Sequence, residues 1–410
     1  MSPTMLLVLA TVIVIAFLLG MVISAAMNRR TKGEEAPNLT PYYSDDVLEG
    51  PRLNRVLAWA LAGSAIVAVA LPTYWLLEPG RQNSRETEVL TSSVQKGAEL
   101  FSSAASGGSP NALGCADCHG ATGGGGARPL IVSIPRDDID LVDPELAIGL
   151  RSDQPGYAEQ QELIASTNEE LAADAGEGEA PENVNPLCYE VEGDETNYAC
   201  SVSWAAPALN TVYYRFSREE IGNIITYGRA GTPMGAWGIA GGGPLTEQKI
   251  DSLLDFLATI QLSPDEVAKQ QSDAVAAAKD AGKTDEPEWL FEQNCARCHT
   301  RHWSISSVFD ANPAIDLVLD QGNGAFGPSL QSGATLRQFL TPEDQSAFVS
   351  RGSDANAAYG QRGIGSGRMP GFGPTTFHPG TGNEADSAMV SGSMLTEEEI
   401  NQIVEYERGL

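Results

Sequence analysis

The chain contains one five-residue pattern twice, and no other feature restricts its fold as strongly. Cys-x-x-Cys-His is the attachment sequence for c-type haem. Its two thiols lie close enough to form thioethers with the two vinyl groups of one porphyrin, and the histidine can then turn under the ring toward the iron. The pattern therefore predicts two covalently attached haem c groups, around each of which part of the chain must fold. Its two occurrences are Cys115-Ala116-Asp117-Cys118-His119 and Cys295-Ala296-Arg297-Cys298-His299.

Zinc is the alternative ligand for Cys-x-x-Cys pairs, because two such pairs can supply four tetrahedral ligands to one ion. Here each pair carries its own histidine, and about 180 residues separate the two pairs. A zinc site would require both pairs to meet around one ion, whereas haem attachment needs only one pair per cofactor. The spacing therefore favours two haems.

The N-terminal region contains two uncharged runs. Residues 6–27 are almost wholly apolar, and no charged residue precedes Arg29. Residues 56–77 form the second run, which is long enough to cross a bilayer core of about 20 residues. A cleaved signal peptide would carry a positive segment and a shorter apolar core. We expect a retained membrane anchor over residues 1–78, with helices at about 6–27 and 56–77. Two buried helices of a soluble domain are the alternative.

Basic residues predict the orientation of this anchor. Arg29, Arg30 and Lys32 follow the first run, and Arg52 and Arg55 precede the second. Cytoplasmic loops carry an excess of Lys and Arg. Residues 28–55 are therefore expected in the cytoplasm, so that the two helices form a hairpin and everything after about residue 78 lies outside. Residues 78–93 are expected to form a polar tether.

Two of the six cysteines are not part of the repeated pattern. These are Cys188 and Cys200. If the region after residue 78 lies in an oxidising compartment, such a couple is expected to pair. The sequence thus predicts a disulfide between them, with free buried thiols as the alternative.

The charge balance excludes one class of partner. The formal net charge is −29, from 25 Lys and Arg against 54 Asp and Glu. Phosphate contacts need Lys and Arg, so a nucleic-acid partner is not expected. So acidic a surface serves solubility or the docking of a basic partner. Residues 152–214 hold thirteen carboxylates and no Lys or Arg, a composition typical of a solvated or disordered segment.

The segments around the two patterns share one order of elements, although letter-by-letter identity is low. In each, an apolar helical turn precedes the pattern, a proline segment and a methionine loop follow it, and an amphipathic helix closes the unit. Thr246 and Thr396 stand at the expected start of the closing helices, and Thr396-Glu397-Glu398-Glu399 is a capping box. This order predicts a tandem duplication, joined by an Ala-, Gln- and Asp-rich linker at 262–287.

Each unit resembles a class I cytochrome c domain, and the resemblance lies in the attachment pattern, the Pro-x-Leu segment and the methionine in a Gly/Pro loop. It implies that His119 and His299 are proximal iron ligands and that Met234 and Met369 are distal ones. Pro207 and Pro328 would offer backbone carbonyls to the histidine Nδ1–H, a bond that fixes the ring. Met389, Met394 and His378 remain alternatives to Met369.

The resemblance implies a mainly α fold, in which the transmembrane hairpin is followed by two tandem class I cytochrome c domains. Pro328 lies 29 residues beyond His299, but Pro207 lies 88 beyond His119. The first unit, residues 94–261, must therefore carry an insertion of about 60 residues. This acidic insertion is expected at about 127–203. The second unit spans 288–410.

His/Met ligation raises the potential of a c-type haem and fills both axial positions. Such haems transfer single electrons, and the chain is expected to be a non-catalytic subunit. It resembles the membrane-anchored dihaem cytochrome c subunit of bacterial bc-type quinol:cytochrome c reductases. The resemblance implies cytochrome b and Rieske partners, a terminal oxidase as acceptor, and haem domains on the periplasmic side of a bacterial plasma membrane. The N-terminal position of both anchor helices departs from that pattern. Alternatives are the dihaem subunit of a cbb-type haem–copper oxidase and a dihaem peroxidase.

Overall fold

The computed structural model describes residues 50–105, 109–175, 183–280, 286–353, 369–377 and 390–410, together with Ala16, Leu19, Gly20 and Ile23. The chain divides into two compact units, and the boundary falls between Pro79 and Gly80. Most of the helix expected at 6–27 and most of the loop expected at 28–55 lie outside the described residues. The hairpin therefore stays a prediction.

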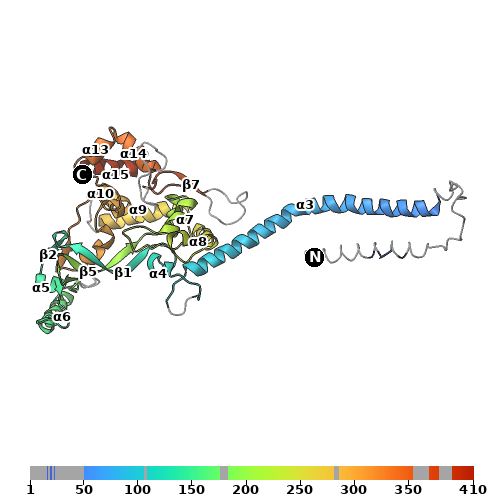
Figure 1. Ribbon diagram of the computed structural model, residues 1–410. Coiled ribbons are helices and arrows are strands. Elements are labelled where there is room, and N and C mark those ends of the chain that lie inside the picture. The colour runs from blue at the N-terminus through green and yellow to red at the C-terminus, as the bar shows by residue number, and fades with distance from the viewer. Residues whose placement is uncertain are drawn as a thin grey trace. The chain divides into compact units, whose positions relative to one another are not determined.

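Helix α3 runs without a break from Pro51 to Phe101 (Figure 1). The separate helix expected at 56–77 and the polar tether expected at 78–93 are thus parts of one helix. The tether contains three Glu and two Arg, which are good helix formers. Its far end is also anchored, because Leu100 and Phe101 are buried.

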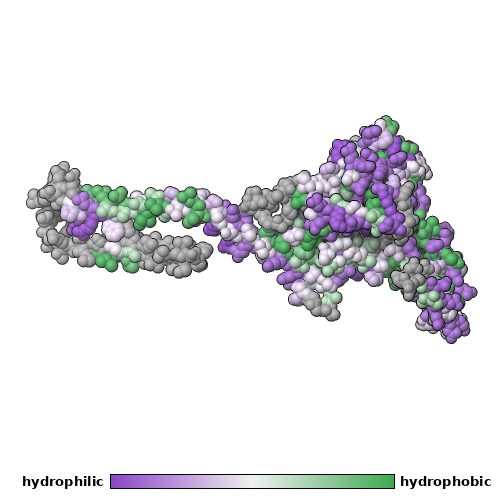
Figure 2. All heavy atoms as spheres, turned by 180° about the vertical axis from the view of Figure 1, so that it is seen from behind, coloured by the Kyte–Doolittle hydropathy of each residue, from purple (hydrophilic) through white to green (hydrophobic). Residues whose placement is uncertain are grey.

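The first part of α3 is long and apolar enough to cross a membrane. Its most apolar 18-residue window has a mean hydropathy of 1.9, and none of that window is buried. Val56 and Leu76 have 63% and 81% of their surface exposed. Figure 2 shows hydrophobic residues over this stretch. Within the described residues, α3 alone meets the requirement of about 20 apolar residues.

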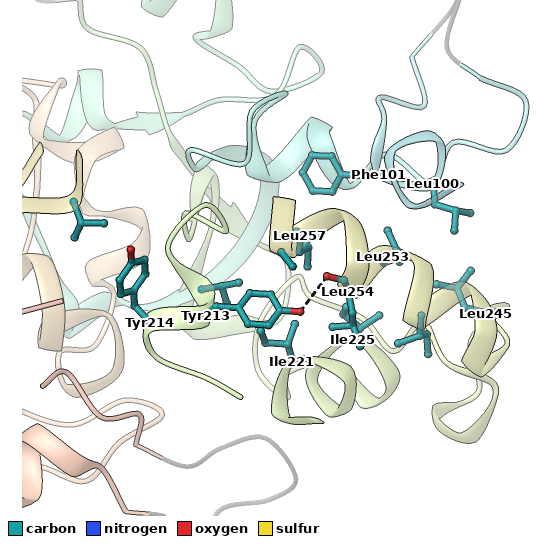
Figure 3. Close-up of a cluster of buried hydrophobic side chains, with 14 residues drawn as sticks. Leu100, Phe101, Tyr213, Tyr214, Ile221, Ile225, Leu245, Leu253, Leu254 and Leu257 are labelled. Carbon is teal, nitrogen blue, oxygen red and sulfur yellow. Dashed lines mark hydrogen bonds between the residues drawn. The ribbon is translucent and has the colours of Figure 1, made fainter. Parts of the chain in front are cut away.

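The first repeat, residues 94–126 and 207–261, has its core between the end of α3, α7 (Arg218–Tyr227) and α8 (Glu247–Thr259). Figure 3 shows this core, in which the Tyr213 hydroxyl donates to the Leu254 carbonyl at 3.0 Å. Gly97 lets α3 approach α8 closely, because a Cβ there would lie 1.9 Å from the Ser252 carbonyl oxygen. The buried stripe of α8 is Ile250, Leu253, Leu254 and Leu257, as its helical spacing predicts.

The second repeat, residues 288–410, has an equivalent core between α10 (Glu286–Phe291), α14 (Pro342–Arg351) and α15 (Glu397–Gly409). The attachment pattern follows α10 through a π-helical turn, η4 (Glu292–Ala296), and α11 (Arg297–His299). Thr396 forms the expected capping box with Glu399. Thr246 is the N-cap of α8, but its side chain makes no capping hydrogen bond.

The two repeats share details of packing and hydrogen bonding. Phe101 packs on Phe256 with ring centroids 5.2 Å apart, and Phe291 packs on Tyr406 at the same distance. A glycine with positive φ ends each middle helix, Gly228 after α7 and Gly352 after α14. These parallel contacts at matching positions show that one arrangement occurs twice in the chain.

The acidic insertion is ordered and has a core of its own. Strands β1 (Gly126–Pro135), β5 (Asp194–Ala206), β4 (Cys188–Val191) and β3 (Ile148–Gly149) form one sheet in that order. Helix α6 (Tyr157–Asp174) contributes Ile164 to the core. The described part is therefore not disordered, although α6 is largely exposed, as the alternative of a solvated segment implies. Tyr198, Cys200 and Val202 alternate into the core, a strand pattern that the dense carboxylates obscured.

The insertion is also attached to the second repeat. Strand β2 (Ile139–Leu141) pairs antiparallel with β6 (Ile315–Leu317). Ile305, Phe309 and Ile315 are buried in the core of the insertion. The expected linker is largely helix α9 (Pro264–Asp280), and its Val267 is buried in the first core. Residues 281–285 lie outside the described part.

Helices predominate, as expected, but the insertion adds a four-stranded sheet. The remaining elements are short. They are α4 (Cys115–His119), η1 (Arg136–Asp138), α5 (Pro144–Ala147), η2 (Val212–Tyr214), η3 (Ile239–Gly241), η5 (Trp303–Ile305), α12 (Ser306–Asp310), α13 (Ala334–Gln338), β7 (Thr375–Phe377) and β8 (Val390–Gly392).

Candidate functional site

The first Cys-x-x-Cys-His pattern forms the short helix α4, which starts directly after Gly114 at φ 78°. Asp117, inside the pattern, holds the preceding loop: its Oδ2 accepts from the Ala104 amide at 3.1 Å and its Oδ1 accepts from the Ser103 hydroxyl. The bond from Ser103 is the main cause that lowers the pKa of Asp117. The start of the helix and the loop before it are thus held by local contacts.

The His119 ring is held by a carbonyl from 88 residues further along the chain. Its Nδ1 lies 2.9 Å from the Pro207 carbonyl oxygen. A carbonyl can only accept a hydrogen bond, so Nδ1 carries the proton and Nε2 keeps its lone pair. Burial lowers the pKa of His119, which the Pro207 bond opposes. The imidazole is therefore neutral at neutral pH and can donate Nε2 to a metal.

His299 has the same arrangement. Its Nδ1 lies 2.8 Å from the Pro328 carbonyl oxygen, and burial lowers its pKa. Gly327 passes directly over the ring, because a Cβ at that position would lie 2.6 Å from Cε1 and 2.8 Å from Nδ1. The structure thus brings each histidine of the pattern to the proline that the sequence assigned to it.

The four cysteines of the two patterns are free thiols. Burial raises the pKa of Cys115 to about 11, and it also raises the pKa of Cys295 and Cys298. These sulfur atoms are accordingly uncharged at neutral pH. A thioether is uncharged as well, so the environment of the thiols suits covalent attachment to a vinyl group.

The two methionine loops are equivalent. The carbonyl of Met234 accepts from the Arg229 amide at 2.9 Å, and that of Met369 accepts from the Ser353 amide at 3.1 Å. A Cβ on Gly228 or Gly352 would lie within 2.8 Å of the backbone of these loops. Each methionine is therefore held by backbone contacts to the end of the preceding helix, and Met369 packs on the second core.

Of the three alternatives to Met369, the described part of the structure includes only Met394. Met394 packs against the first and the second core, where it fills space between the repeats. Met389 and His378 lie outside the described residues. Among the described methionines, Met369 occupies the position that corresponds to Met234.

Cys188 and Cys200 form a disulfide in the insertion. They lie opposite each other on β4 and β5, and both are fully buried. The bond links the two strands at the centre of the insertion, remote in sequence from both attachment patterns.

Sequence reasoning did not find that the two candidate sites adjoin. Phe326, next to Gly327, lies 3.3 Å from the Cβ position of Gly231 and packs on Trp204 with centroids 6.4 Å apart. Arg297 of the second pattern donates to the Ala205 carbonyl at 2.6 Å. The two patterns differ at a single residue, Asp117 in the first and Arg297 in the second. This difference was the one sign in the sequence that the two sites have different surroundings.

Comparison of the chain with protein-family models, curated proteins and solved structures found no match. Among the residues that the structure describes, no three or more His, Cys, Asp or Glu side chains gather as a metal site. The chemistry therefore has to be argued from the two sites themselves. Each offers an imidazole whose Nδ1 is bonded to a proline carbonyl, together with two free thiols of the same short pattern, and this is a set that fits one haem.

Proposed function

We propose that the chain is a membrane-anchored dihaem electron-transfer subunit. The observation that carries this proposal is the repeated bond between a histidine Nδ1 and a proline carbonyl. It occurs at 2.9 Å in the first repeat and at 2.8 Å in the second. A bond of this kind fixes the ring orientation and the tautomer of a metal-binding histidine. Cys115, Cys118, Cys295 and Cys298 would hold the two porphyrins.

The chain's own residues would set the behaviour of each haem. His119 and His299 would each hold a haem iron through Nε2, and Met234 and Met369 would each hold it through the thioether sulfur. Methionine ligation favours a high reduction potential, and two filled axial positions leave no place for a substrate. A haem bound there would supply a one-electron couple, and the protein would hold its ligands in place.

The contacts between the two sites support electron passage within one chain. The loop that carries Pro328 lies against the loop that carries Met234, through Phe326 and Gly231. Arg297 reaches from the second pattern to the segment just before Pro207. Two haems held in this way would be neighbours, so an electron taken up by one could pass to the other without a second protein.

The proposed setting is the periplasmic side of a bacterial plasma membrane, with α3 as part of the anchor. The proposed donor is a quinol-oxidising bc-type complex with cytochrome b and a Rieske protein, and the proposed acceptor is a terminal oxidase. The apolar stretch of α3 supports the anchoring. The acidic composition suits a basic docking partner, because complementary charge speeds encounter.

Haem content tests the cofactor directly. The full chain, produced with haem attachment in the periplasm, should carry two haems by the pyridine haemochrome assay. The double variant Cys115→Ala with Cys118→Ala should carry one, whereas Cys188→Ala with Cys200→Ala should still carry two. An unchanged content in the first variant would refute the assignment of the pattern.

Purification from the native membrane in mild detergent tests the partners. Co-purification with cytochrome b and a Rieske protein, with reduction of both haems by quinol, is the expected result. Co-purification with a haem–copper oxidase and no Rieske protein would replace this setting with that of an oxidase subunit. A high-spin ferric signal with peroxide turnover would indicate a peroxidase instead.

A further inference from the structure

The two attachment patterns differ at one position, and the two residues there behave in opposite ways. Asp117 turns back on its own repeat and binds Ser103 and Ala104. Arg297 turns away from its own repeat: its Nη1 donates to the Ala205 carbonyl of β5 at 2.6 Å. Its guanidinium carbon also lies 4.8 Å from the centre of the Trp303 ring. The second pattern therefore reaches the edge of the first site.

Arg297 and Arg215 both donate to carbonyls of the segment that contains Pro207, and Arg229 is a further arginine of the first repeat. Arg215 donates to the Ala208 carbonyl at 3.2 Å, and Arg229 lies over the Phe216 ring at 5.3 Å. Arg215, Arg229 and Arg297 all act electrostatically on the Cys298 thiol, each lowering a pKa that burial raises. We call these three residues the arginine cluster. It lies at the boundary of the repeats, around the second attachment pattern.

All three residues of the cluster are half-buried. Burial lowers the pKa of all three guanidinium groups, that of Arg215 to about 10. The Nε of Arg215 is buried and has no hydrogen-bond partner in the described part of the chain. None of the ion pairs found among the described residues includes an arginine of the cluster. Glu220 acts on Arg229 through space, and its carboxylate accepts hydrogen bonds from Ser217.

Three positive charges in one partly buried region destabilise the fold unless an anion binds between them, because buried charges are normally paired. The chain has an excess of acidic residues, 54 against 25 basic ones, and still presents three arginines to one another here. No carboxylate of the described residues forms an ion pair with these three arginines, so a bound anion can take that place. Arginine is well suited to it, since its planar fork binds carboxylates in two places at once.

We propose that Arg215, Arg229 and Arg297 form a carboxylate pocket shared by both repeats, which receives an ionised propionate of the first haem. This inference rests on the proposed dihaem function. Position favours the first haem, because Arg215 and Arg229 belong to the first repeat and the carbonyl that Arg297 binds precedes Pro207 by two residues. Arg297 also acts on the electrostatic environment of His119. It is a positioning residue supplied by one haem site to the other.

Two consequences follow. A fixed positive charge beside a haem disfavours the ferric state, which carries one positive charge more than the ferrous state, and so raises the reduction potential. The pocket also keeps the propionate ionised, because a nearby cation lowers the pKa of a carboxyl group. Loss of Arg297 should therefore lower the potential of the first haem and make it depend on pH.

The test is a spectroelectrochemical titration of the full-length dihaem protein in detergent. Arg297→Gln should lower one of the two midpoint potentials by a tenfold shift in its ferric/ferrous equilibrium, which is about 59 mV for one electron. Arg297→Lys should recover most of the shift. Arg301→Gln is the matched control, since Arg301 is four residues away, half-exposed and 3.6 Å from Asp138.

Further measurements on the same variants separate failure of the pocket from failure of the proposed function. The Arg297→Gln shift should persist in 1 M salt, where surface charges are screened, and that variant should gain a pH-dependent potential between about pH 5 and 8. Loss of one haem in Arg297→Gln but not in Arg297→Lys would also support the pocket. Two bound haems with unchanged potentials would overturn it and leave the proposed function standing. Absence of haem in the unmodified chain would overturn the proposed function itself.

Discussion

Gly327→Ala should displace the His299 ring, because the new methyl group has no space. The Cβ would lie 2.6 Å from Cε1, 2.8 Å from Nδ1 and 3.0 Å from Nε2. An ordinary contact begins at about 3.4 Å, and all three atoms belong to a rigid aromatic ring. The ring therefore has to withdraw as a whole, and its hydrogen bond to the Pro328 carbonyl, 2.8 Å long, is strained or lost.

The expected cost is about 2 kcal/mol. Overpacking a closely packed site costs about 1–3 kcal/mol, and one lost hydrogen bond contributes about 1 kcal/mol within that range. Denaturant unfolding of the full chain in detergent measures the free energy of unfolding. If the proposed haem is bound, a high-spin fraction at the second haem should accompany the loss, because the displaced ring holds the iron less well.

Gly409→Ala is the matched control. Gly409 ends α15 in the same repeat, and a Cβ there meets nothing within 4 Å. This variant should keep the free energy of unfolding and the spectrum. If Gly327→Ala behaves like Gly409→Ala in both measurements, the close approach of Gly327 to the ring does not exist in solution.

Three further predictions concern separate residues. Met369→Ala should yield a high-spin second haem that binds added imidazole, whereas Met394→Ala should leave the spectrum unchanged; the opposite result would transfer the ligand role to Met394. Burial raises the pKa of Glu407 from 4.5 to about 7, so its contribution to folding is full below pH 4.5 and is lost as the pH rises through 7. The loss is about 3 kcal/mol, and Glu407→Gln should remove this part of the pH dependence in unfolding measurements; an unchanged profile would refute the raised pKa. Thr396→Ala should cost about 1 kcal/mol, because it removes a side-chain cap, and Thr246→Ala at the equivalent position, which has no such bond, should cost less; equal losses would contradict the difference in capping.

Short-range features of this protein were readable from the sequence because they depend on residue type and spacing. The two Cys-x-x-Cys-His patterns, the cap at Thr396 and the apolar stripe of α8 are of this kind. Assignment of Pro207 to His119 across 88 residues was different, since it came from the resemblance of each unit to a class I cytochrome c domain and from the shared order of elements. In the structure the two residues lie within hydrogen-bond distance.

Composition was a poor guide where packing decides the outcome. Residues 78–93 are polar and were expected to be a tether, but one end of this stretch is fixed on a buried core and the helix continues through it. The insertion is acidic, yet its strand β5 buries Tyr198, Cys200 and Val202 in alternation, and the number of charged residues does not reveal that pattern. In both cases the polar side chains face solvent while the backbone is ordered by apolar neighbours.

Contacts between the repeats depended on the tertiary structure alone. Nothing in the residues around Arg297 indicates that it reaches Ala205, because the two are 92 positions apart and belong to different parts of the chain. The same holds for Arg215, Arg229 and the packing of Phe326 on Trp204. A sequence motif specifies what a short segment can bind; which charges surround it is decided by the other segments that the fold brings there.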